Sequence, residues 1–194
     1  MKNKVGKKKV AKPIDQAFEV YSKRIHDEDM LELLAKHNLK VAGSVPSVMW
    51  ELFGSLLTGR SGSGAVGADL FGWEVKSAIR GSGYEYQYHL NTGEEKLKED
   101  CEVNHLFCSY TKNYKDVLVM AMPGSVLAQD YFEAWLPQYR QNYSATNKAE
   151  RRQRFRKSIG HAVVLKRGAR VLEIVGGKLV YRDDKLIPKM NRGL

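Results

Sequence analysis

The stretch "GADLFGWEVKSAI", residues 67–79, places three charged side chains among small and apolar neighbours. The charged residues are Asp69, Glu74 and Lys76. Because residues two apart in a β-strand point to the same face, a strand over 73–79 puts Glu74 and Lys76 side by side. A turn at "LFG", after a short strand around 68–70, brings Asp69 back toward them. The stretch therefore predicts a β-hairpin in which two carboxylates and one ammonium group converge.

These three groups together suit the hydrolysis of a phosphodiester bond. Mg²⁺ prefers oxygen ligands and usually takes one or two carboxylates, together with water and phosphate. Bound metal favours deprotonation of an attacking water and neutralises charge in the transition state. A lysine beside the metal holds the phosphate and positions the water. An alternative stays open here, because the loose pattern D-x4-E-x-K also occurs in ordinary salt bridges at a sheet edge.

The chain is strongly basic, which favours a polyanionic partner. Its 194 residues carry a net charge of +10. Two stretches contain basic residues and no acidic one, "MKNKVGKKKVAK" at 1–12 and "RRQRFRKSIGHAVVLKRGAR" at 151–170. Such patches neutralise phosphates, although 151–157 alternatively forms a solvated helix end. The expected contacts with the DNA backbone are Lys7, Lys8, Lys9, Arg151, Arg152, Arg154 and Arg156.

The composition predicts one globular domain behind a flexible basic arm at 1–12. The hydrophobic fraction is 43%, and no apolar run is long enough to cross a membrane. Two cysteines, Cys101 and Cys108, make no disulfide framework, and the lysine-rich start is unlike a secretory signal. We therefore expect a cytoplasmic protein with free thiols and no membrane partner.

The periodicity along 13–194 predicts an α/β fold (mixed α+β), in which helices flank one central mixed sheet. Helices are expected at 14–37, 44–59 and 125–143, with Gly59 ending the second. Strands are expected at 73–79, 84–90, "HLFCSYTK" and "KDVLVMAMP", the last being apolar enough for a central strand. "HAVVLKRG" and "RVLEIVGGKLVYRD" read as terminal strands. The catalytic core then spans about 44–143, and a basic C-terminal β extension spans about 150–194.

The segment "YEYQYHLN", residues 84–91, alternates tyrosines with polar residues. One face carries Tyr84, Tyr86 and Tyr88. The other face carries Gln87 and His89, which are suited to contact base edges or phosphates in a DNA groove. A half-buried strand with a polar outer face is the alternative. Asn91 lies in the turn that follows.

Three further motifs in the sequence could belong to a functional site. Glu51 lies off the apolar face of its predicted helix and is either an outer acid of the site or a solvated side chain. "GRSGSGAVGAD" lacks the Gly-Lys-Ser/Thr ending of a phosphate-binding loop. Cys101, His105 and Cys108 lack a fourth ligand for zinc, so a packed strand is the better interpretation.

At these residues the chain resembles the PD-(D/E)xK, or restriction-endonuclease-like, superfamily. The matching motif is Asp69 with Glu74-Val75-Lys76, and Ala68 stands where the motif name has proline. The order of "ELFGSLLTGRSG", the Asp/Glu-x-Lys hairpin and "KSAI" is similar to the helix, loop and catalytic strand of PvuII-type enzymes. In "YEYQYHLN", His89 matches a histidine run of those enzymes that touches bases, and Tyr88 replaces one histidine. The resemblance covers about 48–140.

The resemblance implies a restriction-endonuclease-like core and a sequence-specific type II endonuclease for double-stranded DNA. Asp69 and Glu74 would hold Mg²⁺, with Mn²⁺ as a substitute, Lys76 would orient the attacking water, and Glu51 would assist. Tyr88 would join Gln87, His89 and Asn91 among the DNA-binding residues. A homodimer through the N-terminal helices and a cognate DNA methyltransferase are the implied partners. The alternatives are a structure-specific nuclease, such as a junction resolvase or repair nickase, and a non-catalytic DNA-binding protein.

Overall fold

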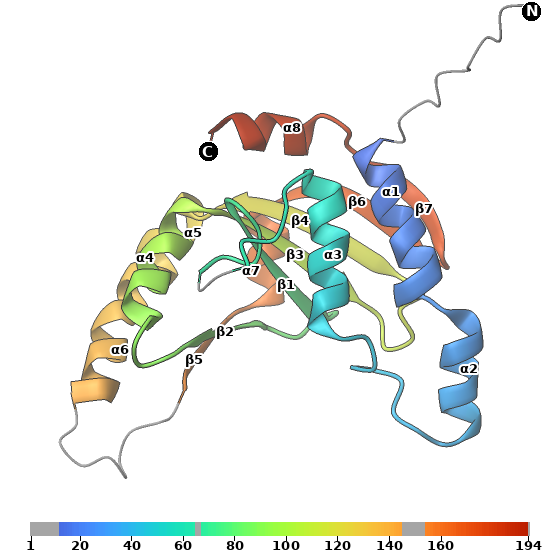
Figure 1. Cartoon of the computed structure of the whole chain (residues 1–194), viewed down its shortest axis with the longest axis horizontal. Coiled ribbons are helices and arrows are strands. Elements are labelled where there is room, and N and C mark those ends of the chain that lie inside the picture. Colours follow the sequence, from blue (N-terminus) through green and yellow to red (C-terminus); the bar gives the residue numbers. More distant parts are fainter. Residues whose placement is uncertain (1–11, 65–66, 145–153, 194) are drawn as a thin grey trace, which may run out of the picture.

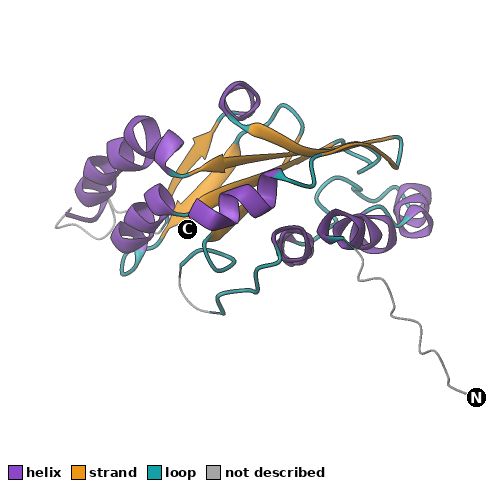
Figure 2. Ribbon diagram, turned by 90° about the horizontal axis from the view of Figure 1, so that it is seen from above, coloured by secondary structure: helices purple, strands orange, loops and turns teal. Residues whose placement is uncertain are grey.

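The computed structural model describes residues 12–64, 67–144 and 154–193 and has a mixed α/β architecture. A five-stranded sheet forms the centre, and helices lie on both of its faces (Figure 1, Figure 2). The predicted fold class, a central mixed sheet flanked by helices, is therefore confirmed. In the described residues no helix is long and apolar enough to cross a membrane.

The order of strands in the sheet is β1-β3-β4-β6-β7. β1 pairs with β3 in parallel, and every other neighbouring pair is antiparallel. The apolar strand β4 lies in the middle, as its sequence predicts. β1 lies at one edge of the sheet, and this position leaves one side of its backbone without a strand partner. The strands are β1 (Trp73–Ile79), β3 (Asn104–Tyr110), β4 (Val117–Pro123), β6 (Ala169–Val175) and β7 (Lys178–Arg182).

One face of the sheet packs against helices from both ends of the chain. Side chains such as Val75, Leu106 and Val119 point to this face and form one hydrophobic core with α1 and α3. α3 ends at Gly59, whose φ of 67° suits a glycine in the left-handed region, as predicted. The helices of this layer are α1 (Pro13–Val20), α3 (Ser47–Thr58) and α8 (Leu186–Met190), and α2 (Glu28–Lys36) projects beside them (Figure 1).

The other face of the sheet carries a second core, in which Phe107 and Met120 of the sheet meet aromatic side chains. A separate two-stranded antiparallel ribbon, β2 with β5, leads from the end of β1 toward α4 and α6 (Figure 1). The elements of this layer are β2 (Tyr84–Tyr88), α4 (Gly93–Glu102), α5 (Ser125–Leu127), a π-helical turn (Ala128–Phe132), α6 (Glu133–Ser144), β5 (Phe155–Ile159) and α7 (His161–Arg167).

Several expectations about elements were wrong. The helix expected over 14–37 is broken into α1, a π-helical turn at Tyr21–Ile25 and α2. "HAVVLKR" forms α7 instead of a strand, because a short apolar run with β-branched residues reads equally well as either element. Three further helices or strands were not expected, α4, β5 and α8. In the C-terminal part of the chain, β6 pairs with β4 inside the central sheet and β5 pairs with β2.

Candidate active site at the edge of the sheet

Asp69 reaches the edge strand through a tight turn. Leu70 and Trp73 exchange backbone hydrogen bonds of 2.9 and 3.0 Å across Phe71 and Gly72, whose φ of 77° is accessible to glycine. Of residues 68–70 only Leu70 forms isolated bridges, to Gly62 and Trp73, and the strand that we expected is absent there. The predicted consequence is nevertheless confirmed, because the turn carries Asp69 back to β1.

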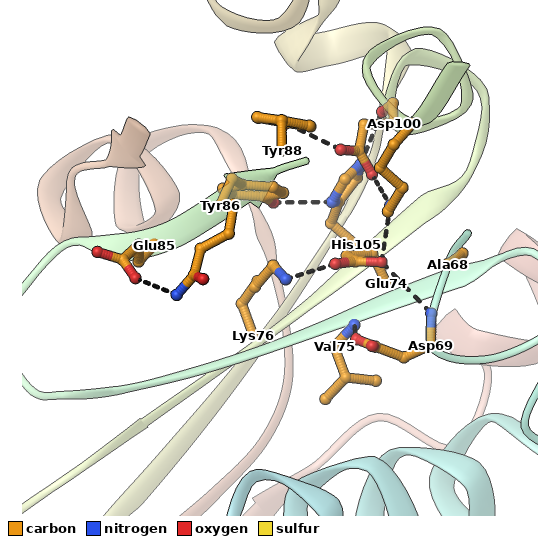
Figure 3. A network of polar contacts seen from close by, with 12 residues as sticks. Ala68, Asp69, Glu74, Val75, Lys76, Glu85, Tyr86, Tyr88, Asp100 and His105 are labelled. Atoms are coloured by element: carbon orange, nitrogen blue, oxygen red, sulfur yellow. Dashed lines mark hydrogen bonds and ion pairs between the residues drawn. The ribbon is translucent and has the colours of Figure 1, made fainter. Parts of the chain in front are cut away.

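The contacts of Asp69 follow from the position of β1 at the sheet edge. The backbone N–H of Val75 donates a 2.9 Å hydrogen bond to Oδ2 of Asp69. In the other direction, the backbone N–H of Asp69 lies 3.4 Å from Oε2 of Glu74 (Figure 3). The two residues predicted to converge are thus in contact, and the charge of the Glu74 carboxylate acts on the Asp69 carboxyl.

Glu74 and Lys76 point to the same face of β1, as the strand period predicts. The ammonium group of Lys76 forms an ion pair with Oε1 of Glu74. The Lys76 ammonium also lies 4.8 Å from the centre of the Tyr86 ring, in a cation–π geometry. Glu74 is 3% exposed, and the side chain of Lys76 is 20% exposed. The lysine therefore lies between the buried carboxylate and the outside.

A second lysine, which no sequence motif singled out, completes the environment of Glu74. Lys96 projects from α4, and its ammonium group donates a 2.9 Å hydrogen bond to Oε2 of Glu74. The same ammonium group forms an ion pair with Asp100 one helical turn later and lies 3.7 Å from Glu99. Tyr88 in turn donates a 2.9 Å hydrogen bond to the other oxygen of Asp100 (Figure 3).

These contacts decide the charge of Glu74. Burial raises the pKa of this carboxyl, but the ammonium groups of Lys76 and Lys96 outweigh burial and lower the pKa to about 2. Burial likewise disfavours the ammonium form of Lys96, but the charges of Glu74 and Asp100 overcome that cost and raise its pKa. Glu74 is therefore a carboxylate, and Lys96 an ammonium ion, at neutral pH.

The neighbouring aspartates are shifted in the opposite direction. Burial, followed by the negative charge of Glu74, raises the pKa of Asp69 to about 6. The charge of Glu51 adds to this rise, so Glu51 lies near enough to Asp69 to act on it. Burial also raises the pKa of Asp100 to about 6 against the pull of Lys96. The site therefore holds more negative charge than its two lysines neutralise.

His105 packs beneath this network with both ring nitrogens engaged. Nε2 lies 2.8 Å from the carbonyl oxygen of Asp100, which can only accept, so Nε2 carries the proton. Nδ1 then accepts a 2.8 Å hydrogen bond from the Tyr86 hydroxyl. Burial lowers the pKa of His105 to about 4. The prediction that Cys101, His105 and Cys108 form no zinc site agrees with these contacts, and both cysteines are free.

Glu51 lies on α3 and is half-buried. In the part of the chain that the structure describes, its carboxylate makes no hydrogen bond and no ion pair. Its effect on the pKa of Asp69 places it close to the site, so the role of an outer acid stays a prediction.

The predicted DNA-binding residues divide into three groups. Gln87, His89, Asn91, Arg154 and Arg156 are exposed, and the guanidinium of Arg154 donates a 3.3 Å hydrogen bond to Gln87 across the ribbon. The side chain of Tyr88 is buried at 1% exposure, so the expectation that it contacts DNA was wrong. Lys7, Lys8, Lys9, Arg151 and Arg152 lie outside the described residues.

The donor set fits a hard divalent cation. Within the described ranges, no three or more His, Cys, Asp or Glu side chains cluster closely enough to hold a metal ion by themselves. Mg²⁺ needs only one or two carboxylates when water and substrate phosphate supply the other ligands. Asp69 and Glu74 provide two carboxylates. Burial is the main cause of the raised pKa of Asp69, and the negative charge of Glu74 adds a repulsion that a cation would offset.

The site thus combines two carboxylates, two lysines and an unusually polar interior at one edge of an otherwise apolar sheet. Comparison with models of known protein families and with curated proteins found no match.

Proposed function

We propose that this protein is a Mg²⁺-dependent endonuclease for double-stranded DNA, of the kind represented by type II restriction enzymes. One observation carries the proposal, namely the convergence of Asp69, Glu74 and Lys76 at the edge of β1. A strongly basic chain supports a polyanionic substrate, because its net charge is +10. The resemblance of these residues to the PD-(D/E)xK motif supports the same reaction.

Each residue has a chemical role in this proposal. Asp69 and Glu74 hold Mg²⁺, and Mn²⁺ takes the same oxygen ligands. When bound, the ion supplies positive charge that polarises the phosphoryl group and favours deprotonation of water. Lys76 leaves Glu74 to hold a phosphate oxygen and the attacking water. This role requires an ammonium group that a substrate can reach, and the side chain of Lys76 is partly exposed. Glu51 contributes negative charge from α3.

The rest of the proposal concerns how the DNA is held. The exposed face of the β2–β5 ribbon carries Gln87, Arg154 and Arg156, and a two-stranded ribbon is of a size that enters the major groove. A twofold homodimer would place one site on each strand of a palindromic sequence. The dimer is expected to form through the N-terminal helices, where Met30 and Leu33 of α2 are exposed. A cytoplasmic DNA methyltransferase would be the companion of such an enzyme.

The test is the digestion of supercoiled plasmid DNA with Mg²⁺, in which the wild type is compared with Asp69→Ala and Lys76→Ala. We expect cleavage by the wild type, with a loss of at least about 100-fold in each variant, because each change removes a metal ligand or a phosphate contact. DNA binding without metal should persist in both variants. Lys98→Ala, which changes an exposed lysine of α4 outside the network, is the matched control and should cut normally.

The products distinguish the alternatives. A fixed set of bands with direct appearance of linear plasmid means a sequence-specific dimer, whereas accumulation of nicked circles means a monomer. Cleavage confined to branched DNA means a structure-specific nuclease. Binding without any Mg²⁺-dependent cutting means a non-catalytic DNA-binding protein, and wild-type cutting by Lys76→Ala would reject the assigned site.

A further inference from the structure

Each oxygen of the Glu74 carboxylate is engaged by a different lysine. Lys76 holds Oε1, and Lys96 holds Oε2 at 2.9 Å. The two lysines come from different elements, since Lys76 lies on the edge strand β1 and Lys96 on α4. The side chain of Lys96 is 14% exposed against 20% for Lys76, and its ammonium group is held by two carboxylates, Glu74 and Asp100. Its role is therefore exerted through the groups that it touches.

Both lysines are supported by tyrosines on the inner face of β2. The ring of Tyr86 lies under the Lys76 ammonium at 4.8 Å. The hydroxyl of Tyr88 donates a 2.9 Å hydrogen bond to Asp100, which forms an ion pair with Lys96. An unbroken set of polar contacts thus runs from β2 through Asp100 and Lys96 to Glu74 (Figure 3).

A contribution to stability alone explains this arrangement poorly. Asp100 is fully buried and Glu74 nearly so, and removing charges from water is costly even when they are paired. Apolar residues of similar volume often replace such buried pairs without loss of stability. The charges have a clear use, however, if the orientation of Glu74 matters, because Lys96 holds one carboxylate oxygen from the interior while Lys76 holds the other from the outside.

We infer that Lys96 is a positioning residue for Glu74, with Asp100 and Tyr88 as its supports. The inference rests on the proposed function and deepens it, because it adds a second lysine to the site and assigns β2 two tasks. The outer face of β2 presents Gln87 to DNA, and its inner face braces the groups that orient Glu74. Lys96 holds Oε2 from the protein interior, so that the carboxylate keeps one orientation when Lys76 turns to the substrate.

The experiment uses a double variant, Lys96→Met with Asp100→Asn, because it removes both charges together and leaves no buried ion unpaired. Asparagine retains an acceptor for the Tyr88 hydroxyl. With supercoiled plasmid and Mg²⁺, we expect kcat to fall at least about tenfold, as for other groups that orient metal ligands. The KM for DNA should stay within about twofold, because DNA does not touch this pair.

A second measurement separates positioning from misfolding. It is the binding of Mn²⁺ in the absence of DNA, monitored by electron paramagnetic resonance. The double variant should bind Mn²⁺ at least as tightly as the wild type, because it lacks an ammonium group that competes for Oε2. A folding defect would instead weaken metal binding and cleavage together. Lys96→Arg, which keeps a cation, should restore part of the lost kcat.

Two single changes on β2 provide a matched pair. Tyr88→Phe removes the hydroxyl that supports Asp100, and kcat should fall about three- to tenfold. Tyr84→Phe removes a hydroxyl from an equally buried tyrosine on the same face, which contacts His161 instead. Its kcat should be unchanged.

The outcomes are distinguishable. Wild-type kcat in the double variant, or loss of kcat in parallel with Mn²⁺ binding and thermal stability, would overturn the inference and leave the proposed function standing. Equal effects of Tyr88→Phe and Tyr84→Phe would also overturn it. A wild-type chain that neither binds Mn²⁺ nor cuts plasmid would overturn both.

Discussion

At the scale of single residues, the surroundings of each acid and base decide its charge. Glu74 stays ionised because two ammonium groups outweigh its burial, whereas burial dominates at Asp69 and Asp100. His105 lies in the same interior without an acidic side chain as hydrogen-bond partner and is kept neutral. Neighbouring carboxyl groups therefore have pKa values that differ in direction, with Glu74 at about 2 and Asp69 and Asp100 at about 6.

The neutral state of His105 predicts a dependence of stability on pH. The folded pKa is about 4 against an ordinary value of 6.5, so between these values the unfolded chain binds more protons than the folded one. The free energy of unfolding therefore rises with pH across this window, and His105 contributes about 3 kcal/mol to the rise. This contribution is lost as the pH falls.

Urea unfolding at pH 4.5, 5.5 and 6.5 measures this contribution. In His105→Gln, the rise in the free energy of unfolding between pH 4.5 and 6.5 should be smaller by up to about 1.4 kcal/mol per pH unit. His37→Gln changes an exposed histidine and should keep the wild-type slope. The same slope in His105→Gln and wild type would contradict the assignment of a buried neutral imidazole.

The sequence predicts one half of the candidate site and omits the other for a physical reason. Asp69, Glu74 and Lys76 are close in sequence, so strand period and one turn suffice to bring them together. Lys96 and Asp100 reach Glu74 only through the packing of α4 on the sheet, and this tertiary contact has no local signature. The alternation correctly places Tyr88 on the aromatic face of its strand, and the assignment of Tyr88 to DNA contact came from the resemblance alone.

At the scale of elements, a helix or strand is predicted correctly where its apolar residues form a clear pattern. β1 and β4 have clear patterns, and their predicted positions are confirmed. α4 was missed because "GEEKLKEDCE" has one buried large apolar residue, Leu97, and so lacks a visible apolar stripe. β5 was missed because Phe155 and Ile159 are separated by basic and polar residues that suggested a solvated segment. Its pairing with β2 is a long-range contact that the sequence does not announce.

The contact of α3 with β1 predicts a specific effect of Gly54. A Cβ atom at this position would lie 2.8 Å from Cγ2 of Val75 and 3.4 Å from Cδ2 of Leu106. Gly54→Ala should therefore destabilise the protein by about 1–3 kcal/mol, although alanine is the better helix former. The reason is that the helix must move away from the strand that carries Glu74 and Lys76.

A double-mutant cycle with Val75→Ala checks this prediction by chemical denaturation. Val75→Ala removes the methyl groups that the new Cβ would meet, so in that background Gly54→Ala should be neutral or stabilising. Additive destabilisation by the two changes would show that the α3–β1 contact is not the cause.

At the scale of the whole molecule, the two edges of the sheet differ. The edge at β1 carries the acidic site and continues into the ribbon with Arg154 and Arg156 exposed. The opposite edge, β7, carries Arg182, which is already engaged by Asp15 and Asp184. The net charge of +10 is a property of the whole chain, and Arg154 and Arg156 provide exposed positive charge on the ribbon that continues the β1 edge.

This asymmetry predicts which arginines set the salt dependence of DNA binding. Each phosphate contact contributes about 0.9 to the slope of log K against log salt, because binding releases condensed counterions. In a Lys76→Ala background without Mg²⁺, Arg154→Ala should reduce this slope by about 0.9. Arg156→Ala should have a smaller effect, because Glu85 lies 3.8 Å from its guanidinium and already neutralises part of its charge.

Arg182→Ala is the control and should leave the slope unchanged. Fluorescence anisotropy of a labelled duplex from 50 to about 300 mM salt measures all three, and an equal change in Arg182→Ala would place the DNA elsewhere.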